Sequence, residues 1–454
     1  MAIADCSLHP IPPIGWTGAH PTYQSAPLSV INLSTKLDHD KFIFVRSATN
    51  NPFNPGSDFV PQVWAGRTAQ LNDWRDVVRP RLLRGLPERG RTVLGEPGLG
   101  KSALVRRIAA DAVDGGGWVT PQLRIPSGAD PLKLVATALL NLAQEAGLPS
   151  RREKRIKDLL SRVQSVAASG ISIGLRESNG ADPHVELTEL LVEIGRAAMQ
   201  RNVICLIHID EVQNITDEQA LSQLLIALGD AITRLVQVEV PGQVRLERAL
   251  PIAVYLTGLP EFEDRAGAHT GATFARRFAT TVLSAIDDDD LTLALQEFVV
   301  PGWSVTDDRG DPGIVRMTPE AVADIVELCR GEPFLFQLAG ERAWYADDSD
   351  LITGDQVRRG WRAAQREAAA HVERILGRLP QRERELVEAM AQLPEAERTL
   401  TRIAERAGFT SASAAGPTSQ RLDTVRGIID RGKPYGFRHR AVEAYLTSDW
   451  PSIG

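Results

Sequence analysis

The sequence predicts an α/β domain with a parallel sheet flanked by helices, followed by an all-helical domain and a small C-terminal domain. Between about residues 59 and 286, short β-branched runs such as VICLIHI alternate with helical patterns, which is typical of a parallel sheet covered on both faces. Beyond Asp287 the strands are expected to stop, because the chain continues as consecutive amphipathic segments. We therefore expect domains at 56–286, 287–378 and 379–454.

Length and composition limit the kinds of protein to be considered. A chain of 454 residues is long enough for about three domains of ordinary size. The formal net charge of -7 gives no general attraction to nucleic acid or to anionic membranes, so any contact with DNA must be local. The three cysteines have no paired spacing, and no segment reaches the roughly 18 apolar residues that a membrane span needs. We expect a cytoplasmic protein without membrane attachment.

Two regions lack the regular patterns of the rest. Residues 1–55 are rich in Pro, Ser, Thr and Asn and show no sustained period, so we expect a poorly ordered N-terminal arm. A helical pattern begins soon after Phe59, where we expect folding to start. In the second region, residues 151–179, alternating apolar residues at 171–175 indicate an inserted strand or hairpin.

The strongest motif is GEPGLGKS, which has the spacing G-x-x-x-x-G-K-[ST] and lies between the predicted strand RTVL and the predicted helix ALVRRIA. Its glycines allow a tight turn whose amides point at phosphates, and the helix N-terminus adds its dipole. Lys101 is expected to reach the β- and γ-phosphates of ATP, and Ser102 to ligate Mg²⁺. The motif makes the first domain an α/β P-loop NTPase. The expected nucleotide-binding residues of the loop are Gly95, Glu96, Pro97, Gly98, Leu99, Gly100, Lys101, Ser102 and Ala103.

Two further strands end in polar residues that complete this site. The apolar run VICLIHIDE ends in two carboxylates, as in a Walker B motif. Asp210 is expected to hold Mg²⁺ through water, and Glu211 to polarise the attacking water, which predicts ATP hydrolysis. The third strand, PIAVYLTG, places Thr257 at the same edge of the sheet. Thr257 is expected to sense the γ-phosphate, unless it simply ends the strand.

Six segments together resemble the AAA+ superfamily, and more narrowly the clade that contains origin-recognition initiators and STAND signalling ATPases. They are AGR at 65–67, GEPGLGKS at 95–102, HIDEVQ at 208–213, LTGLPE at 256–261, ARRF at 275–278 and GEPFLFQLAG at 331–340. The resemblance extends over roughly residues 59–446. It implies that the helical domain is a lid over the nucleotide and that the last domain is a winged helix.

The resemblance also implies residues that hold the nucleotide. Val60, Pro61 and Val63 are similar in position to residues that contact adenine. Gly331 and Pro333 resemble the GxP element that begins a lid helix, although Pro also suits the first turn of any helix. The usual arginine of this lid has no clear counterpart in the motif.

A basic pair follows the third strand. Arg276 and Arg277 resemble the arginine that stabilises γ-phosphate charge in a neighbouring subunit, and which of the two has that role stays open, as does an ordinary surface pair. The resemblance therefore implies a homo-oligomer. In such an assembly hydrolysis would be slow until a neighbour or a partner completes the site.

The last domain reads as three helices and a hairpin, as expected for a winged helix. If residues 420–431 form a recognition helix, Arg421 and Arg426 could face double-stranded DNA while wing residues contact its backbone. Those wing residues are Lys433, Arg438 and Arg440. Winged helices also bind proteins. The sequence thus predicts an ATPase that uses ATP and Mg²⁺ to switch this domain, either in association with DNA or, alternatively, as a STAND-type signalling or defence switch acting on an effector protein.

Overall fold

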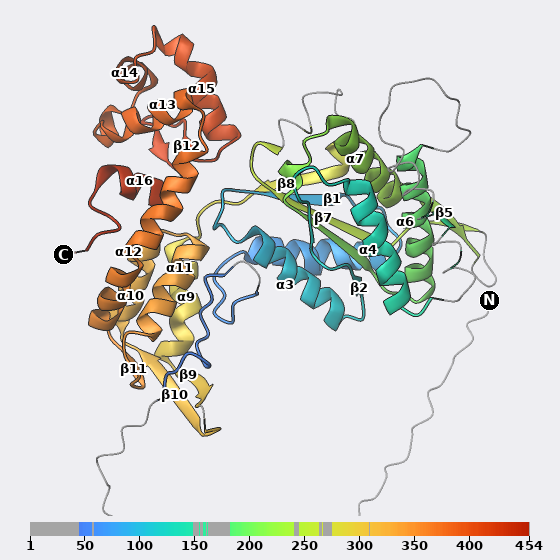
Figure 1. Ribbon diagram of the computed structural model, residues 1–454, viewed down its shortest axis with the longest axis horizontal. Coiled ribbons are helices and arrows are strands. Elements are labelled where there is room, and N and C mark those ends of the chain that lie inside the picture. Colours follow the sequence, from blue (N-terminus) through green and yellow to red (C-terminus); the bar gives the residue numbers. More distant parts are fainter. Residues whose placement is uncertain are drawn as a thin grey trace, which may run out of the picture. The chain divides into compact units, whose positions relative to one another are not determined.

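The computed structural model describes residues 45–56, 59–148, 182–239, 245–262, 275–307 and 309–453, together with residues 154, 158, 159, 161 and 266 (Figure 1). The inserted strand or hairpin expected at 171–175 and residues 1–44 of the arm expected at 1–55 lie outside these residues. Of the three cysteines, Cys205 and Cys329 are described, and both are buried and free. No helix in the described ranges is long and apolar enough to cross a bilayer.

A parallel sheet forms the centre of the first domain, as predicted. Its strands follow the order β2-β4-β7-β1-β8, and β3 pairs with β4 beside β2. Every residue of β1, β4 and β7 is buried, because helices cover both faces of the sheet. The strands are β1 (Gly90–Leu94), β2 (Trp118–Val119), β3 (Leu123–Arg124), β4 (Cys205–Asp210), β7 (Ile252–Gly258) and β8 (Phe278–Val282).

Two apolar clusters attach the helices to this sheet. Trp74 and Leu104 belong to one cluster, together with Leu206 and Tyr255 from the strands. The other cluster joins α4, α6 and α7 to the remaining strand side chains. A hairpin of β5 (Leu235–Val238) and β6 (Leu246–Ala249), which the sequence analysis did not predict, follows α7. The helices are α1 (Thr68–Asn72), a π-helical turn (Asp73–Val78), α2 (Arg79–Leu83), α3 (Lys101–Asp114), α4 (Pro131–Glu145), α6 (Pro183–Gln200) and α7 (Glu218–Thr233).

The second domain is mainly helical, but it also contains a small sheet that corrects the expectation that strands stop after Asp287. Strands β9 and β10 pair as an antiparallel hairpin, and β11 joins β10 in parallel. Val305 of β9 and Val315 of β10 are buried. The alternation of buried and exposed residues in these strands is weak, and the helical pattern around it obscured it. The elements are α9 (Asp288–Val299), β9 (Trp303–Thr306), β10 (Pro312–Met317), α10 (Pro319–Cys329), α11 (Pro333–Trp344), β11 (Leu351–Ile352) and α12 (Gly354–Gly377).

Residues 45–56, which were assigned almost entirely to the poorly ordered arm, pack on this second domain. Arg46 is buried and donates hydrogen bonds to the carbonyl oxygens of Ser349 and Ala343. Phe53 stacks on Phe298 with 5.6 Å between ring centroids. Burial of these two side chains fixes the segment, so the folded chain begins before Phe59.

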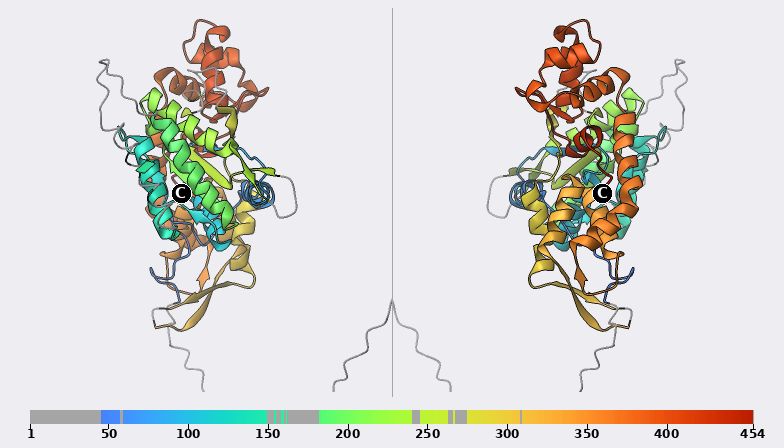
Figure 2. Two further views of the ribbon diagram at one scale, coloured as in Figure 1. Left: turned by 90° about the vertical axis from the view of Figure 1, so that its right-hand side faces the viewer. Right: turned by 90° about the vertical axis from the view of Figure 1, so that its left-hand side faces the viewer.

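The third domain has the element order predicted for a winged helix, three helices followed by a two-stranded hairpin. Figure 2 shows this domain in orange and red. One apolar cluster runs through the second and third domains without interruption, and Trp361 of α12 lies beside Trp450 with 6.2 Å between centroids. The third helix starts at Ala412, before the recognition helix considered at 420–431, and ends before Arg426. The elements are α13 (Gln381–Ala391), α14 (Leu400–Arg406), α15 (Ala412–Thr424), β12 (Ile429–Asp430), β13 (Gly436–Phe437) and α16 (Arg440–Thr447).

Candidate active site

The glycine-rich loop follows buried strand β1 and ends at the first residue of α3, as predicted. Gly98 and Gly100 have φ angles of 87° and 78°, which residues with a Cβ rarely adopt. The ammonium group of Lys101 donates hydrogen bonds to the carbonyl oxygens of Gly95 and Glu96 at 2.9 and 3.0 Å. Burial lowers the pKa of Lys101, and the carboxylates nearby only partly offset this effect. The lysine is thus held inside the loop, where phosphates would be its natural partners.

Asp210, the last residue of β4, lies beside the start of α3. Its Oδ2 accepts a hydrogen bond from Ser102 Oγ at 3.0 Å, and the carboxylate also accepts bonds from Thr257 and Gln122. Burial by itself would raise the pKa of Asp210, but these hydrogen bonds and His208 lower it overall. Asp210 therefore stays ionised, and it forms with the Ser102 hydroxyl a pair of adjacent oxygen donors.

Thr257 lies beneath this carboxylate. It is fully buried at the end of β7, and its hydroxyl bonds to Asp210 while lying 3.2 Å from His208 Nε2. Burial lowers the pKa of His208 to about 4, so its imidazole is neutral near pH 7. Thr257 does not line the cavity described below. The structure thus places it in contact with the expected metal ligand, where the sequence analysis expected contact with the γ-phosphate.

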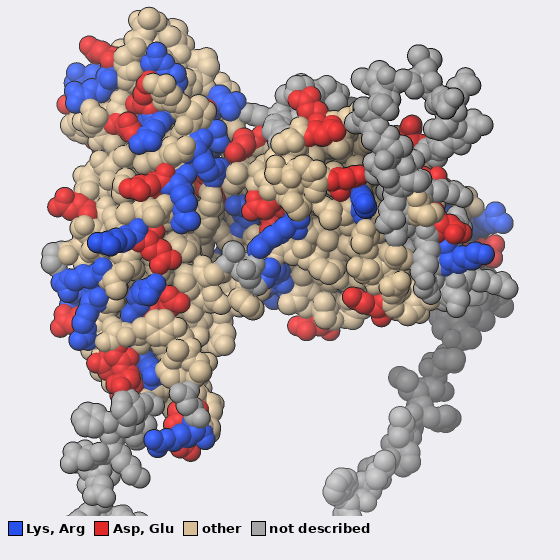
Figure 3. All heavy atoms as spheres, viewed as in Figure 1, with Lys and Arg blue, Asp and Glu red and all other residues tan. Residues whose placement is uncertain are grey.

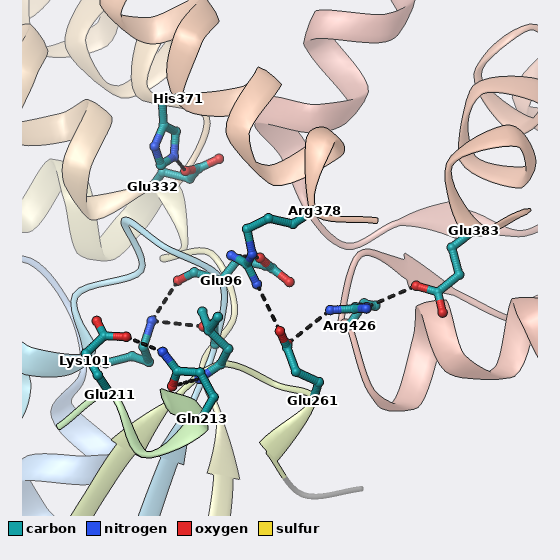
Figure 4. Close-up of polar contacts among 12 residues, drawn as sticks. Glu96, Lys101, Glu211, Gln213, Glu261, Glu332, His371, Arg378, Glu383 and Arg426 are labelled. Carbon is teal, nitrogen blue, oxygen red and sulfur yellow. Dashed lines mark hydrogen bonds and ion pairs between the residues drawn. The ribbon is translucent and has the colours of Figure 1, made fainter. Parts of the chain in front are cut away.

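Glu211 directly follows β4 and itself has a left-handed backbone conformation, with φ 59°. Its side chain lines the cavity. Its carboxylate accepts a hydrogen bond from the side-chain nitrogen of Gln213, Nε2 (Figure 4). The other end of that side chain, Gln213 Oε1, accepts a bond from the backbone amide of Leu259 at 3.1 Å. Sequence reasoning gave Gln213 no role, because a Gln two residues after a carboxylate has no distinctive spacing.

A cavity of about 590 Å³ is lined by most of the residues predicted to bind the nucleotide, although Gly95 and Glu96 of the loop do not line it. It is lined by residues 97–103 of the loop, by Glu211, and by Pro61 and Val63. Val60 does not line it and is 37% exposed. The sequence analysis missed a group of polar and aromatic lining residues on the same side, Asn54, Phe59, Trp64, Phe336 and Gln337.

Helix α11 connects the segments that contain Asn54 and Val63 to the loop. Gln337 accepts a hydrogen bond from the amide of Asn54 at 2.9 Å and donates one to the carbonyl of Val63 at 2.8 Å. At the helix start, the amide of Phe334 donates to the carbonyl of Gly98 at 3.1 Å. The Gln within the apolar run FLFQLAG is the sequence signal that could have identified the hydrogen-bonding role of Gln337, because a buried polar side chain needs partners.

The GxP element occupies the predicted place at the start of α11. Pro333 is the first helical residue and lines the cavity. Gly331 has φ 80° and does not line it, and its carbonyl instead accepts a bond from the amide of Ile286 at 2.7 Å. Gly331 therefore shapes the turn that brings the helix to the cavity.

Three arginines that the sequence analysis did not propose also line the cavity. Arg374 lies in the last turn of α12 and Arg378 directly after it, one turn apart. Arg67 donates a hydrogen bond to the carbonyl of Leu99 at 2.9 Å, and burial lowers its pKa to about 10, so it remains charged. The expected lid arginine was sought near the GxP element, whereas the cations come from the next helix. With Lys101 they give the cavity four cations against Glu211.

The basic pair after β7 lies away from this cavity. Arg277 forms an ion pair with Asp230 at the end of α7. Arg276 is exposed, and no ion pair to it is found among the described residues. Neither arginine lines the cavity of its own chain.

The arginines expected on a recognition helix are bound within the chain. Arg421 and Arg426 both donate to Glu383 of α13 at 3.0 Å, and Arg426, only 7% exposed, also reaches Glu261 of the first domain. Arg426 follows α15 instead of lying on it, which corrects its expected place on that helix. Of the residues expected on the wing, Lys433 lies between β12 and β13 and is exposed, and Arg438 pairs with Asp423. Arg440 is the first residue of α16 and pairs with Asp288, which corrects its expected place on the wing.

No protein-family model matches the chain, and no curated protein matches it. Solved structures do. The ORC2 protein of Aeropyrum pernix, in ADPNP and ADP complexes, is 16% identical with a TM-score of 0.52, over 87% of this chain and 95% of that one. A Walker-type ATPase of Pyrococcus abyssi is 15% identical, over 84% and 96% of the chains, with a TM-score of 0.49. The ORC1 protein of A. pernix in complex with DNA is 16% identical, over 86% and 94%, with a TM-score of 0.38.

Only the first of these three similarities is close enough to carry a conclusion, and at its low identity the conclusion concerns the fold. The chain has the fold of an AAA+ P-loop ATPase of the origin-recognition type, with a parallel sheet, a helical lid and a winged helix. The predicted fold class is confirmed. From here the second domain is called the lid.

Proposed function

We propose that the protein binds ATP with Mg²⁺, hydrolyses it slowly, and uses the nucleotide to move the lid and the winged helix. One observation carries this proposal. Most of the phosphate loop, the carboxylate Glu211, two of the residues expected to contact adenine and the start of the lid line a single cavity. Four cations in that cavity suit a triphosphate, whose charge they would balance. The similar ORC2 protein was solved with nucleotides, which supports the same ligand class here.

The donor atoms beside the loop fit Mg²⁺. Ser102 and Asp210 present a hydroxyl and an ionised carboxylate 3.0 Å apart, and oxygen is the ligand that Mg²⁺ prefers. No group of three or more acidic, histidine or cysteine side chains suited to a metal occurs in the described part of the chain. Ser102 and Asp210 would therefore hold an ion that also depends on phosphate oxygens. When bound, Mg²⁺ would neutralise charge on the β- and γ-phosphates.

The residues of the chain supply positioning, charge and a base. Lys101 would exchange its two carbonyl partners for phosphate oxygens, and Arg374 would approach them from the lid. Glu211, which lines the cavity, would accept a proton from the attacking water. Phosphoryl transfer needs little else from a protein, because it is catalysed mainly by positioning and charge stabilisation.

ATP hydrolysis by Lys101→Ala and Glu211→Gln tests the proposal. Lys101→Ala should lose nucleotide binding, because the cavity loses its central cation. Glu211→Gln should keep binding but lower kcat by about 100-fold, as expected for loss of a general base. Hydrolysis is measured by phosphate release and binding by a fluorescent ATP analogue, with exposed Lys133→Ala and Glu247→Gln as matched controls. Full activity of Glu211→Gln would rule out the assigned base.

The partner of the winged helix follows from the same experiment with duplex DNA present. We propose DNA association in line with the fold, and expect DNA to stimulate hydrolysis and to lose that effect as salt rises. A second candidate, a signalling switch that acts on a protein, is favoured by the ion pairs that engage Arg421 and Arg426 inside the chain. On the face shown in Figure 3, basic and acidic side chains are interspersed. ATPase activity that ignores DNA, with ATP-dependent assembly, would favour the second candidate.

A further inference from the structure

A short segment that begins with the last two residues of β7 connects the candidate active site with the winged helix. Its first residue, Thr257, bonds to the carboxylate of Asp210. Two residues later, the amide of Leu259 donates to Gln213 at 3.1 Å, and Gln213 in turn donates to Glu211. The segment 257–261 thus supports the expected metal ligand directly and the expected base through one side chain.

The last residue of the segment, Glu261, belongs to a group of ion pairs that we call the clamp, made of Glu96, Glu261, Arg378 and Arg426. Arg378 lies 3.0 Å from Glu96 and 3.5 Å from Glu261, and Arg426 lies 3.0 Å from Glu261 (Figure 4). Glu96 comes from the phosphate loop, Arg378 from the end of α12, and Arg426 from the winged helix. The clamp therefore joins all three domains.

Two members of the clamp, Glu96 and Arg426, are buried, which makes the clamp sensitive to the loss of the charges that pair with them. Glu96 is only 2% exposed and Arg426 only 7%. Burial raises the pKa of Glu96, and Arg378 works against that rise. Removing one partner from such a group leaves a buried charge without compensation, which is far more costly than losing a surface pair.

The lid and the winged helix are packed together as one unit, because a single apolar cluster runs through both. Arg378 also lines the nucleotide cavity, yet two carboxylates already engage its guanidinium group. These carboxylates compete with phosphate for the same cation. The arrangement seen here consequently keeps one cavity cation occupied while Gln213 occupies an oxygen of Glu211.

Building on the proposed ATPase function, we propose that Gln213 and Glu261 are positioning residues that make hydrolysis depend on the docking of the winged helix. With Arg426 on Glu261, the segment 257–261 holds Gln213 against Glu211, and hydrolysis is restrained. Release of Arg426 lets the segment move, which frees Glu211 for water and removes one of the two carboxylates that engage Arg378. Whether the winged helix is docked or released thereby determines whether Glu211 is available to the attacking water.

Steady-state hydrolysis by Arg426→Gln tests this inference. We expect kcat to rise about threefold or more with KM within about twofold of wild type, and Arg426→Lys to return kcat to the wild-type value. The matched control is Arg398→Gln, which also removes a buried arginine of the winged helix, but one paired with Glu443 at 2.8 Å and not with Glu261. This control should leave kcat unchanged.

The role of Gln213 is tested by a double-mutant cycle. Gln213→Leu can neither donate to Glu211 nor accept from Leu259, so it should raise kcat by the same route. Added to Arg426→Gln, it should then give no further increase, because the two changes act on one connection. An additive increase, or a decrease in kcat for Gln213→Leu, would overturn the role assigned to it.

Hydrogen exchange of the peptide that covers residues 257–262 separates this inference from the ATPase proposal. Exchange there should accelerate in Arg426→Gln and not in Arg398→Gln, since the Leu259 amide loses its acceptor. Equal kcat and equal exchange in the two variants, or a lower kcat in Arg426→Gln, would overturn the coupling while wild-type hydrolysis still supported the ATPase. If wild type binds ATP without hydrolysing it, the ATPase proposal fails, and the exchange measurement still decides whether docking reaches this segment.

Discussion

Thr257 shows how much one hydroxyl group can contribute to this site. It is fully buried and bonds to Asp210, whose ionised form is stabilised by such hydrogen bonds. A threonine at this position would stabilise the ionised form of the expected metal ligand, Asp210, whether or not it also contacts a phosphate. Its importance can therefore be tested through the charge of Asp210.

Thr257→Val should make Asp210 lose its ionised form at a higher pH than in the wild-type protein. The variant removes a hydrogen bond that lowers the pKa of Asp210, while the burial that raises this pKa remains, so the pKa rises. As the pH falls, the variant therefore loses the ionised form of Asp210 at a higher pH than wild type does. The stability that this form contributes above its pKa is lost with it. A lost bond of about 1 kcal/mol corresponds to about a fivefold higher Mg²⁺ requirement.

The measurement is hydrolysis against pH and against Mg²⁺ concentration, with Thr92→Val as the control because Thr92 is a buried threonine of the neighbouring strand β1. The acid limb should move to higher pH in Thr257→Val and stay in place in Thr92→Val. An acid limb and a Mg²⁺ requirement that match wild type would contradict the contribution assigned to Thr257.

Single residues differed in how far the sequence could place them. The loop and the two carboxylates were predictable, because their spacing fixes backbone positions around a phosphate and the strands bring them to one edge. Arg67, Arg378 and Gln337 were not, because each reaches the cavity from a separate segment through a side chain. Arg426 was misplaced because helix ends depend on capping, and α15 ends two residues before it.

At the level of elements, the segment 45–56 matters more than its composition suggested. Phe53 is 3% exposed and packs between Phe298 and Phe336, and the next residue, Asn54, bonds to Gln337 of α11. A Cβ on Gly340 would collide with the Phe53 ring, so the helix surface is fitted to it. The segment thus holds one wall of the nucleotide cavity, and its Pro- and Asn-rich composition hid this.

Phe53→Ala should lower the unfolding free energy by about 3 kcal/mol or more, as for other buried aromatic side chains, and should weaken ATP binding because Asn54 loses its support. Phe59→Ala is the paired variant, since Phe59 lines the cavity but is 65% exposed. It should weaken ATP binding with little change in stability. Chemical denaturation and nucleotide titration measure both quantities, and equal stability of the two variants would contradict the packing assigned to Phe53.

At the scale of the whole molecule, the fold class followed from the alternation of strands and helices, whereas the way the domains share their surfaces did not. Sequence patterns report which residues are buried but not against what. The shared cluster of the lid and winged helix and the clamp around Glu261 both arise from contacts between residues far apart in the chain. The small lid sheet was missed for the same reason, since β11 joins it from 34 residues beyond β10.

The exposed Arg276 leads to a prediction about assembly. Arg277 is held by Asp230, so Arg276 is the better candidate to act on a neighbouring subunit. Arg276→Ala should lose most hydrolysis, and Arg277→Ala should keep more of it. Mixing Arg276→Ala protein with Glu211→Gln protein should restore part of the activity, because each supplies what the other lacks at a shared site.

Specific activity should accordingly rise with protein concentration in wild type, in parallel with mass measured in solution. If the mixture stays inactive while both variants assemble, Arg276 does not act across subunits. If Arg277→Ala is the inactive variant that the mixture rescues, the two roles are reversed.

The uninterrupted apolar cluster beneath α12 has a consequence for how such a protein can change over evolutionary time. A domain attached by a flexible tether can be exchanged for another, because its removal uncovers little. Here Trp450 packs on Trp361, whose indole N–H donates to the carbonyl of Pro451 at 2.8 Å, so removing the winged helix would strip the lid of its own interior. We therefore expect the two domains to be inherited together, and a new binding specificity to arise by changes to surface residues of the winged helix that is already present.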